Sequence, residues 1–182
     1  MDQLTRASLE AIRSGDKNAQ NRAFEHLSAA TADPVDWAYE AWDGLLESLR
    51  HKDNRCRSIA SQILCNLAKS DPKKRMVRDV AALIAVTKDE KFVTARHCMQ
   101  SLWKVGAAGT SQRKVLVEGL TIRFQECVAE KNCTLIRYDI VESLRKMYDA
   151  AGAETVKRKA LELIETEPDL KYRKKYATLW KR

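Results

Sequence analysis

The residue types that could hold a metal ion or act as nucleophiles are scattered along this sequence. Its 182 residues include five cysteines, Cys56, Cys65, Cys98, Cys127 and Cys133, and three histidines, His26, His51 and His97. Structural zinc sites usually take their ligands from close pairs of the Cys-x-x-Cys kind, and these cysteines form none. His97 and Cys98 are adjacent, so on a helix their side chains would point about 100° apart. We therefore expect five free, mostly buried thiols, no bound metal and no other cofactor.

Catalytic motifs are also missing from the sequence. It contains no glycine-rich phosphate loop, no Gly-x-Ser-x-Gly nucleophile motif and no His-Glu-x-x-His zinc motif. These absences leave open whether the protein is an enzyme, but they favour a protein that is not one.

The amino-acid composition limits the class of protein to which this chain can belong. Hydrophobic residues make up 45% and charged residues 32% of the chain, as in an ordered protein with a charged surface. No apolar run approaches the roughly 20 residues of a membrane helix, and the first residues contain no apolar signal-peptide core. We therefore expect a single domain over 1–182, located in the cytoplasm and not bound to a membrane. The net charge of +8 suits a polyanionic partner without proving one.

The pattern of apolar residues predicts helices throughout. Only 3 prolines and 6 glycines are present, and apolar residues recur at spacings of three and four with no sustained alternation. The ten predicted helical segments are 2–13, 16–30, 34–50, 53–69, 72–87, 89–105, 109–130, 132–150, 152–166 and 168–181. The residues that mark their ends are Asp16, Asp53 and Asp169 as N-terminal signals, Pro34 and Pro72 in first turns, and Gly15, Gly106 and Gly152 at helix ends.

Every second segment repeats the same pattern of residues. The aligned positions are Arg57, Ala60, Leu64 and Leu67, then Ala95, Cys98, Leu102 and Val105, then Arg137, Ile140, Leu144 and Met147, and last Arg173, Tyr176 and Trp180. The period is close to 40 residues, with two helices in each unit. Such a period is typical of a solenoid, in which stacked helix pairs bury the faces that one pair alone leaves open.

The 53–67 segment, with its form D-x-x-x-R-x-x-A-x-x-x-L-x-x-L, resembles the second helix of a HEAT repeat, as do "IRYDIVESLRKM" and "YRKKYATLW". The resemblance to the HEAT-repeat (armadillo-like) superfamily implies an all-α fold, a right-handed α–α superhelix of about five helical pairs. It also implies that Arg57, Arg137 and Arg173 form a ladder with acids of neighbouring units. The chain departs from the repeat at Ala95, where the basic residue is missing.

Charge is concentrated on the second helix of each pair. Those segments hold 17 basic and 9 acidic residues, whereas the rest of the chain holds 16 of each. In HEAT arrays the second helices line the concave face, so this face is expected to be basic. Taking every fourth residue, its solvent stripe includes Ser58, Gln62, Asn66, Glu142, Thr178 and Arg182. The binding candidates on or beside it are Arg55, Arg96, Gln100, Lys104, Tyr138, Lys146, Lys171 and Lys174.

Two classes of function fit this stripe. The resemblance to HEAT arrays favours a non-catalytic scaffold or adaptor that binds a protein partner through its concave face. The alternative is a nucleic-acid contact, because basic, amide and hydroxyl groups on one face suit a phosphate backbone. A solvated face with no partner would carry the same charges.

A more distant resemblance, to the HEAT-like DNA alkylation repair glycosylases, implies tryptophans and an acid in a basic groove. Glu142 is the one weak catalytic candidate, with Tyr138 one turn before it. Trp37, Trp42, Trp103 and Trp180 are expected in core or helix-packing positions and not on the stripe, which weighs against this activity. Small HEAT-like modules that assist a cofactor enzyme, such as the phycobilin lyase type, are a third alternative that no residue selects.

Overall fold

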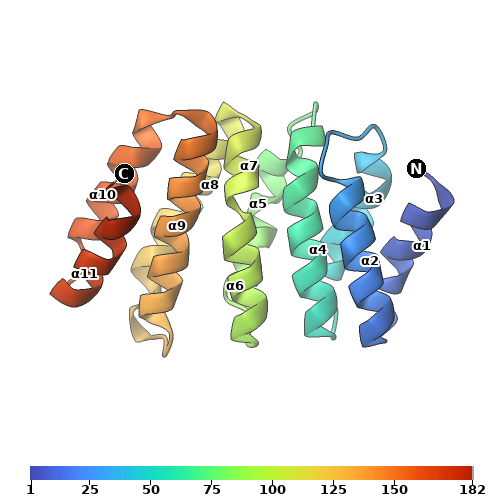
Figure 1. Ribbon diagram of the computed structural model, residues 1–182, viewed down its shortest axis with the longest axis horizontal. Helices are drawn as coiled ribbons and strands as arrows, with labels where there is room; N and C mark the ends of the chain where they lie inside the picture. The colour runs from blue at the N-terminus through green and yellow to red at the C-terminus, as the bar shows by residue number, and fades with distance from the viewer. Residues whose placement is uncertain (182) are drawn as a thin grey trace.

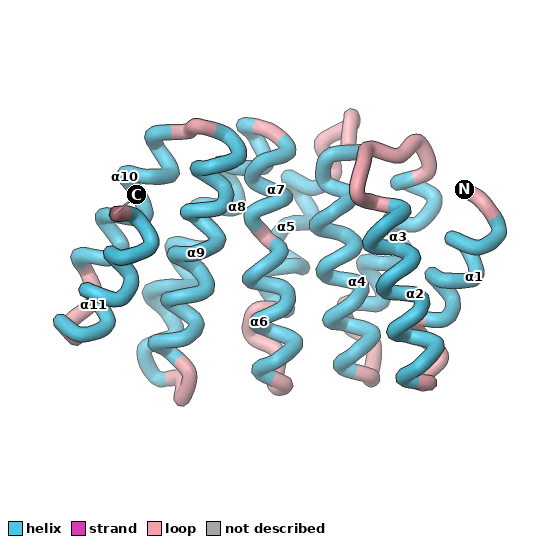
Figure 2. Tube along the Cα trace, in the orientation of Figure 1, coloured by secondary structure: helices cyan, strands magenta, loops and turns pink. Residues whose placement is uncertain are grey.

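The computed structural model describes residues 1–181, which form eleven α-helices, three short 3₁₀ turns and no β-strand (Figure 2). The helices are α1 (Gln3–Ala11), α2 (Lys17–Ala30), α3 (Ala38–Ser48), α4 (Asn54–Leu67), α5 (Met76–Val86), α6 (Phe92–Ser101), α7 (Trp103–Ala108), α8 (Thr110–Glu126), α9 (Cys133–Ala151), α10 (Glu154–Glu165) and α11 (Leu170–Ala177). The predicted 89–105 segment is divided at Leu102 into α6 and α7. Within the described residues, no helix combines the length and the apolar character that crossing a membrane requires.

The helices form two parallel rows. α2, α4, α6 with α7, α9 and α11 lie in one row, and α1, α3, α5, α8 and α10 lie behind them, with the chain ends at opposite ends of the array (Figure 1). Neighbours within the first of these rows pack against each other, and each also packs against its partner in the second row. The predicted solenoid of five helical pairs is therefore confirmed. We call the surface of the α2, α4, α6–α7, α9 and α11 row the second-helix face.

The repeat alignment also predicts the core correctly. Of the ten aligned apolar side chains of the second, third and fourth pairs, Ala95 has 2% exposure and the other nine have 0%; these nine are Ala60, Leu64, Leu67, Cys98, Leu102, Val105, Ile140, Leu144 and Met147. Because each pair stacks in the same way on the next, equivalent positions meet equivalent neighbours. One period in the sequence thus becomes one continuous core.

Local capping explains several of the helix starts. The carboxylate of Asp16 accepts a hydrogen bond from the N–H of Ala19 (2.6 Å), and Asp53 and Asp169 cap α4 and α11 in the same way. These three predicted signals are confirmed. The placement of Pro34 and Pro72 in first turns is wrong, because α3 and α5 begin four residues further along the chain.

The start of α5 uses a different acid. Buried Asp71 accepts hydrogen bonds from the N–H groups of Arg75 (2.8 Å) and Met76 (2.7 Å) and from the hydroxyl of Tyr39 (2.6 Å). One carboxylate therefore holds the helix start and ties it to α3, so the helix does not need to begin at the proline.

Gly152 and Gly106 are glycines for different structural reasons. Gly152 ends α9 in the left-handed conformation (φ +61°), where glycine is unstrained, as predicted. Gly106 does not end a helix but lies buried within α7, where a Cβ would sit 2.5 Å from the Sδ atom of Met147. Its missing side chain lets α9 approach α7 closely.

Ion pairs join neighbouring pairs of helices in a ladder. Arg57 binds Asp89 through two hydrogen bonds (2.6 and 2.8 Å), and Arg137 binds Glu167 (2.8 Å). The predicted ladder is confirmed at these two positions. Arg173, in the last pair, instead donates to the backbone carbonyl of Glu167 (2.7 and 2.9 Å) and pairs more loosely with Glu165 of the same helix pair (3.7 Å).

The ion pair between Arg57 and Asp89 makes the stability of the fold depend on pH. Burial alone would raise the pKa of Asp89, but hydrogen bonds from Arg57 and from the N–H of Lys91 lower it below its ordinary value of 3.8. A carboxyl group whose folded pKa is lowered stabilises the fold above its unfolded pKa, and this contribution is lost as the pH falls through the folded pKa. We expect the Asp89→Asn variant to be less stable than wild type at pH 7 but to lose less stability between pH 5 and pH 2.

Urea unfolding followed by circular dichroism at these pH values measures the difference. Asp36→Asn, a change at an exposed residue in the loop before α3, is the control. An Asp89→Asn variant that loses as much stability on acidification as wild type would contradict this account.

Candidate binding groove

Three neighbouring helices present matching rows of side chains on the second-helix face. On α2 and α4 the rows follow spacings of three and four residues, which keep side chains on one side of a helix. The residues are Asn21, Phe24, Ser28 and Thr31 from α2 and its C-cap, Arg55, Ser58, Gln62, Asn66 and Lys69 from α4 and the turn after it, and Val93, His97, Trp103, Lys104 and Ala107 from α6 and α7.

These rows enclose two adjoining hollows. One has a volume of about 480 Å³ and lies between α2, α4 and α7, and the other, of about 320 Å³, lies between α2, α4 and α6. Phe24 and Gln62 line both hollows, so the two hollows adjoin at these side chains. We call this combined feature the groove. It crosses three successive repeats.

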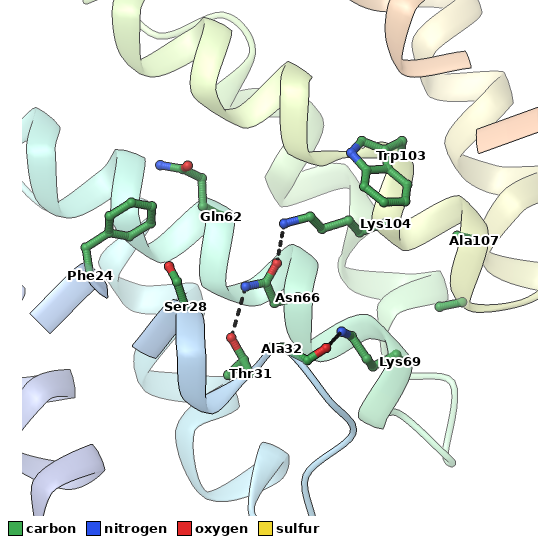
Figure 3. Close-up of a pocket in the computed structure, with 11 residues that line it drawn as sticks. Phe24, Ser28, Thr31, Ala32, Gln62, Asn66, Lys69, Trp103, Lys104 and Ala107 are labelled. Carbon is green, nitrogen blue, oxygen red and sulfur yellow. Dashed lines mark hydrogen bonds between the residues drawn. The ribbon is translucent and has the colours of Figure 1, made fainter. Parts of the chain in front are cut away.

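A chain of hydrogen bonds forms the floor of the larger hollow (Figure 3). The Nζ atom of Lys104 donates to the side-chain oxygen of Asn66 (2.6 Å), whose amide nitrogen donates to the hydroxyl of Thr31 (2.9 Å). Lys69 donates to the backbone carbonyl of Ala32 at the rim. Three helices are thus tied together by side chains that face the groove.

Lys104 holds a positive charge where water is partly excluded. Burial lowers the pKa of its ammonium group below the ordinary value, and the nearby charge of Lys69 adds to the effect. Its hydrogen-bond partner in the described structure, Asn66, is a neutral amide. A carboxylate or phosphate that entered the groove would relieve this unfavourable charge, because ion pairs are stronger in a partly desolvated site.

The smaller hollow has a similar polar character. Arg55 donates to the side-chain oxygen of Asn21, and Ser58 and His97 share a hydrogen bond of 2.9 Å. Burial lowers the pKa of His97 below 6.5, and the charges of Arg96 and Arg55 lower it further. These effects favour the neutral form of His97, and Arg55 supplies the positive charge at this end.

Two aromatic side chains form apolar walls. Phe24 borders both hollows, and the indole of Trp103 borders the larger one opposite it (Figure 3). Trp103 packs against the core, as expected, but it also borders the larger hollow on this face, where no tryptophan was expected. The side chains on this part of the groove come from two helices, because α6 ends at Ser101 and α7 begins at Trp103, so a count along one continuous helix does not place Trp103.

The charged side chains that line the groove are all positive. Its described lining residues include the cations Arg55, Lys69 and Lys104 and the amides of Asn21, Asn54, Gln62 and Asn66, but no aspartate or glutamate. Arg55 and Lys104 are the two predicted binding residues that the structure brings into the groove. Sequence reasoning missed Phe24, Trp103 and Lys69, although Gln62 and Asn66 on the predicted stripe mark the same surface.

Arg96 and Gln100 belong to an ion pair and not to the groove. Arg96 donates two hydrogen bonds to Asp139 (2.7 and 3.0 Å), a carboxylate with 0% exposure, and Gln100 reaches the same group (3.4 Å). This pair joins the third and fourth repeats, next to Ala95, where the regular ladder residue is absent. Arg96, predicted as a solvent-facing contact, is 35% exposed, but its charge is paired with that of a buried acid.

The other predicted residues lie beyond the groove, on α9 and α11. Lys146 pairs with Glu142 one turn away (3.0 Å), and Tyr138 packs beneath Lys175. Lys171 and Lys174 are exposed on α11, with Lys171 over the ring of Tyr172. Arg182, also predicted on the stripe, is outside the described residues.

The cysteines are five free thiols in this structure. Residues 1–181 contain no group of three or more histidine, cysteine, aspartate or glutamate side chains arranged to hold a metal ion.

We compared the chain with protein families, curated proteins and solved structures, and only the solved structures gave matches. No protein-family model and no curated protein matches this chain. Among solved structures, the chain is similar to an engineered protein with a TM-score of 0.51 and 15% identity, over 98% of this chain and 95% of the other. A second engineered protein has a TM-score of 0.51, 13% identity and coverage of 99% and 88%. A designed armadillo repeat protein in complex with the peptide (KR)4 has a TM-score of 0.50, 12% identity and coverage of 98% of both chains.

The fold is an armadillo/HEAT-like repeat solenoid. Identities of this size establish the shared fold alone, and they carry no residue of the groove from one protein to another.

Proposed function

We propose that this protein is a non-catalytic adaptor whose groove binds an extended, acidic segment of a partner protein. The observation that carries the proposal is the lining of the groove, in which cations and amides surround two aromatic walls without an aspartate or glutamate among the described residues. The cations suit carboxylates, the amides suit a peptide backbone, and the aromatic walls suit one apolar side chain.

The groove also fits an extended chain in shape. It runs across three parallel helices, so successive residues of a bound segment would meet successive repeats. The designed armadillo protein at a TM-score of 0.50 was solved with the basic peptide (KR)4. In the present protein the charge of the groove is positive, and the complementary segment is therefore acidic.

The nucleic-acid alternative has weaker support. Of the predicted phosphate contacts, Arg96 is neutralised by Asp139 and Lys146 by Glu142. Glu142, the acid that a glycosylase would need, lines neither hollow. Trp103 and Phe24 could stack on bases, so single-stranded DNA belongs in the same experiment.

Fluorescence anisotropy with labelled ligands tests the proposal. The ligands are a twelve-residue peptide of aspartate and glutamate with one central leucine, the peptide (KR)4, and a twelve-nucleotide oligo-dT. We expect the acidic peptide to bind and (KR)4 not to bind. Because Lys104 lies at the floor of the groove, Lys104→Glu is expected to weaken acidic-peptide binding by at least about tenfold.

Lys114→Glu, which changes charge equally at an exposed residue of α8 in the other row, is the matched control. At 0.15 M salt we expect it to change affinity by less than about twofold, because charges beyond about 8 Å are largely screened. Tight binding of oligo-dT with a log–log salt slope of about −0.7 per phosphate, and none of the acidic peptide, would replace the proposal with the nucleic-acid alternative. Equal losses in the two variants would remove the groove as the site.

A further inference from the structure

Two of the five thiols meet at the turn between α8 and α9. The Sγ atoms of Cys127 and Cys133 are 3.2 Å apart. No hydrogen bond joins any other two cysteine side chains in the described part of the chain, and Cys56, Cys65 and Cys98 each have 0% exposure. Cys127 also has 0% exposure, whereas Cys133 is partly exposed, so this pair lies at the edge of the core.

The turn brings the sulfurs together and can adjust to join them. Cys127 begins a short 3₁₀ turn, Cys133 is the first residue of α9, and the intervening residues 128–131 are exposed. A disulfide needs a sulfur–sulfur distance of about 2.05 Å, so the two sulfurs must approach by about 1 Å. Since exposed residues connect the two cysteines and Cys133 is itself partly exposed, Cys133 can move toward Cys127, which is part of the core.

We propose that Cys127 and Cys133 form an oxidation-sensitive dithiol, which hydrogen peroxide converts to an intramolecular disulfide. Cys133 is partly exposed, whereas Cys127 is fully buried, so peroxide reaches Cys133 first. The Cys133 thiolate attacks one peroxide oxygen, the O–O bond breaks, and a sulfenic acid and hydroxide form. The sulfur of Cys127 then displaces the hydroxyl group from the Cys133 sulfur.

This second step forms the S–S bond, and the proton of Cys127 leaves with the hydroxyl group as water. In total, two thiols and one hydrogen peroxide give one disulfide and two water molecules. Burial, and then the neighbouring Cys133, raise the pKa of Cys127 to about 12. Cys127 is thus protonated at neutral pH, and together with the exposure of Cys133 this makes Cys133 the sulfur that peroxide oxidises first.

Peptide mapping of the full chain tests this assignment directly. Trypsin cleaves after Arg123, Lys131 and Arg137, so Cys127 and Cys133 fall in separate peptides, 124–131 and 132–137. After treatment with hydrogen peroxide and blocking of free thiols, the wild-type digest is expected to contain these two peptides joined by a disulfide. Thiol titration under denaturing conditions is expected to fall from five per chain to three.

Two variants make the test specific. Cys133→Ser is expected to lose the joined peptides, while Cys56→Ser, at a fully buried site on α4, is expected to keep them and to fall from four thiols to two. If Cys133→Ser does not fold by circular dichroism, the wild-type map decides alone. Joined peptides from other cysteines, disulfide-linked dimers, or sulfinic acid at Cys133 without the joined peptides would each overturn the proposal.

Discussion

Replacing Arg96 with methionine is expected to lower the free energy of unfolding by about 3–5 kcal/mol, whereas replacing Lys146 with methionine is expected to change it by at most about 0.5 kcal/mol. Both are cations on the second-helix face that pair with an acid. Arg96 is the partner of Asp139, which has 0% exposure, and its removal leaves a buried carboxylate without its ion pair. The side chains of Lys146 and Glu142 are 44% and 28% exposed, so water replaces the lost contact.

Urea unfolding followed by circular dichroism measures both variants against wild type. The double variant Arg96→Met, Asp139→Asn is expected to recover part of the loss, because the charge that lacks a partner is then also removed. The dependence of the free energy on urea should be compared as well, since repeat arrays can unfold in parts. Similar losses in Arg96→Met and Lys146→Met would show that Asp139 does not hold a buried charge.

Replacing Trp103 with alanine is expected to weaken binding of the leucine-containing acidic peptide by about 30- to 100-fold, which corresponds to about 2–3 kcal/mol. The reason is that an aromatic wall beside a partly desolvated cation provides the apolar contact on which a bound side chain would rest. The same variant is expected to weaken a peptide of aspartate and glutamate alone far less. Anisotropy titrations with the two peptides measure this difference.

Trp37→Ala is the matched control for Trp103→Ala. Trp37 is a partly buried tryptophan at the start of α3, in the other row, and it lines neither hollow of the groove. We expect it to leave peptide affinity unchanged once folding has been verified. An equal loss for both peptides in Trp103→Ala would mean that the indole supports the groove without contacting an apolar residue of the ligand.

The sequence by itself determined the helices and their stacking. Carboxylates such as Asp16 and Asp53 cap their own helices, and Gly152 ends α9, through bonds within four residues along the chain. The solenoid was also predictable, because a period near 40 residues places equivalent apolar residues in equivalent surroundings. The core positions therefore follow from periodicity, which a sequence displays directly.

Only the tertiary structure decided which charges are available to a partner. Arg96 and Asp139 are 43 residues apart, and Lys104 reaches Asn66 across 38 residues. A count of charges by helix treats Arg96 and Lys104 alike, although one is neutralised by a buried acid and the other faces a groove. The same holds for Trp103, and for Cys127 and Cys133, whose sulfurs meet only through the shape of a turn. Such contacts depend on the angles between elements and on the directions of side chains. The spacing of residue types along the sequence does not predict either of these.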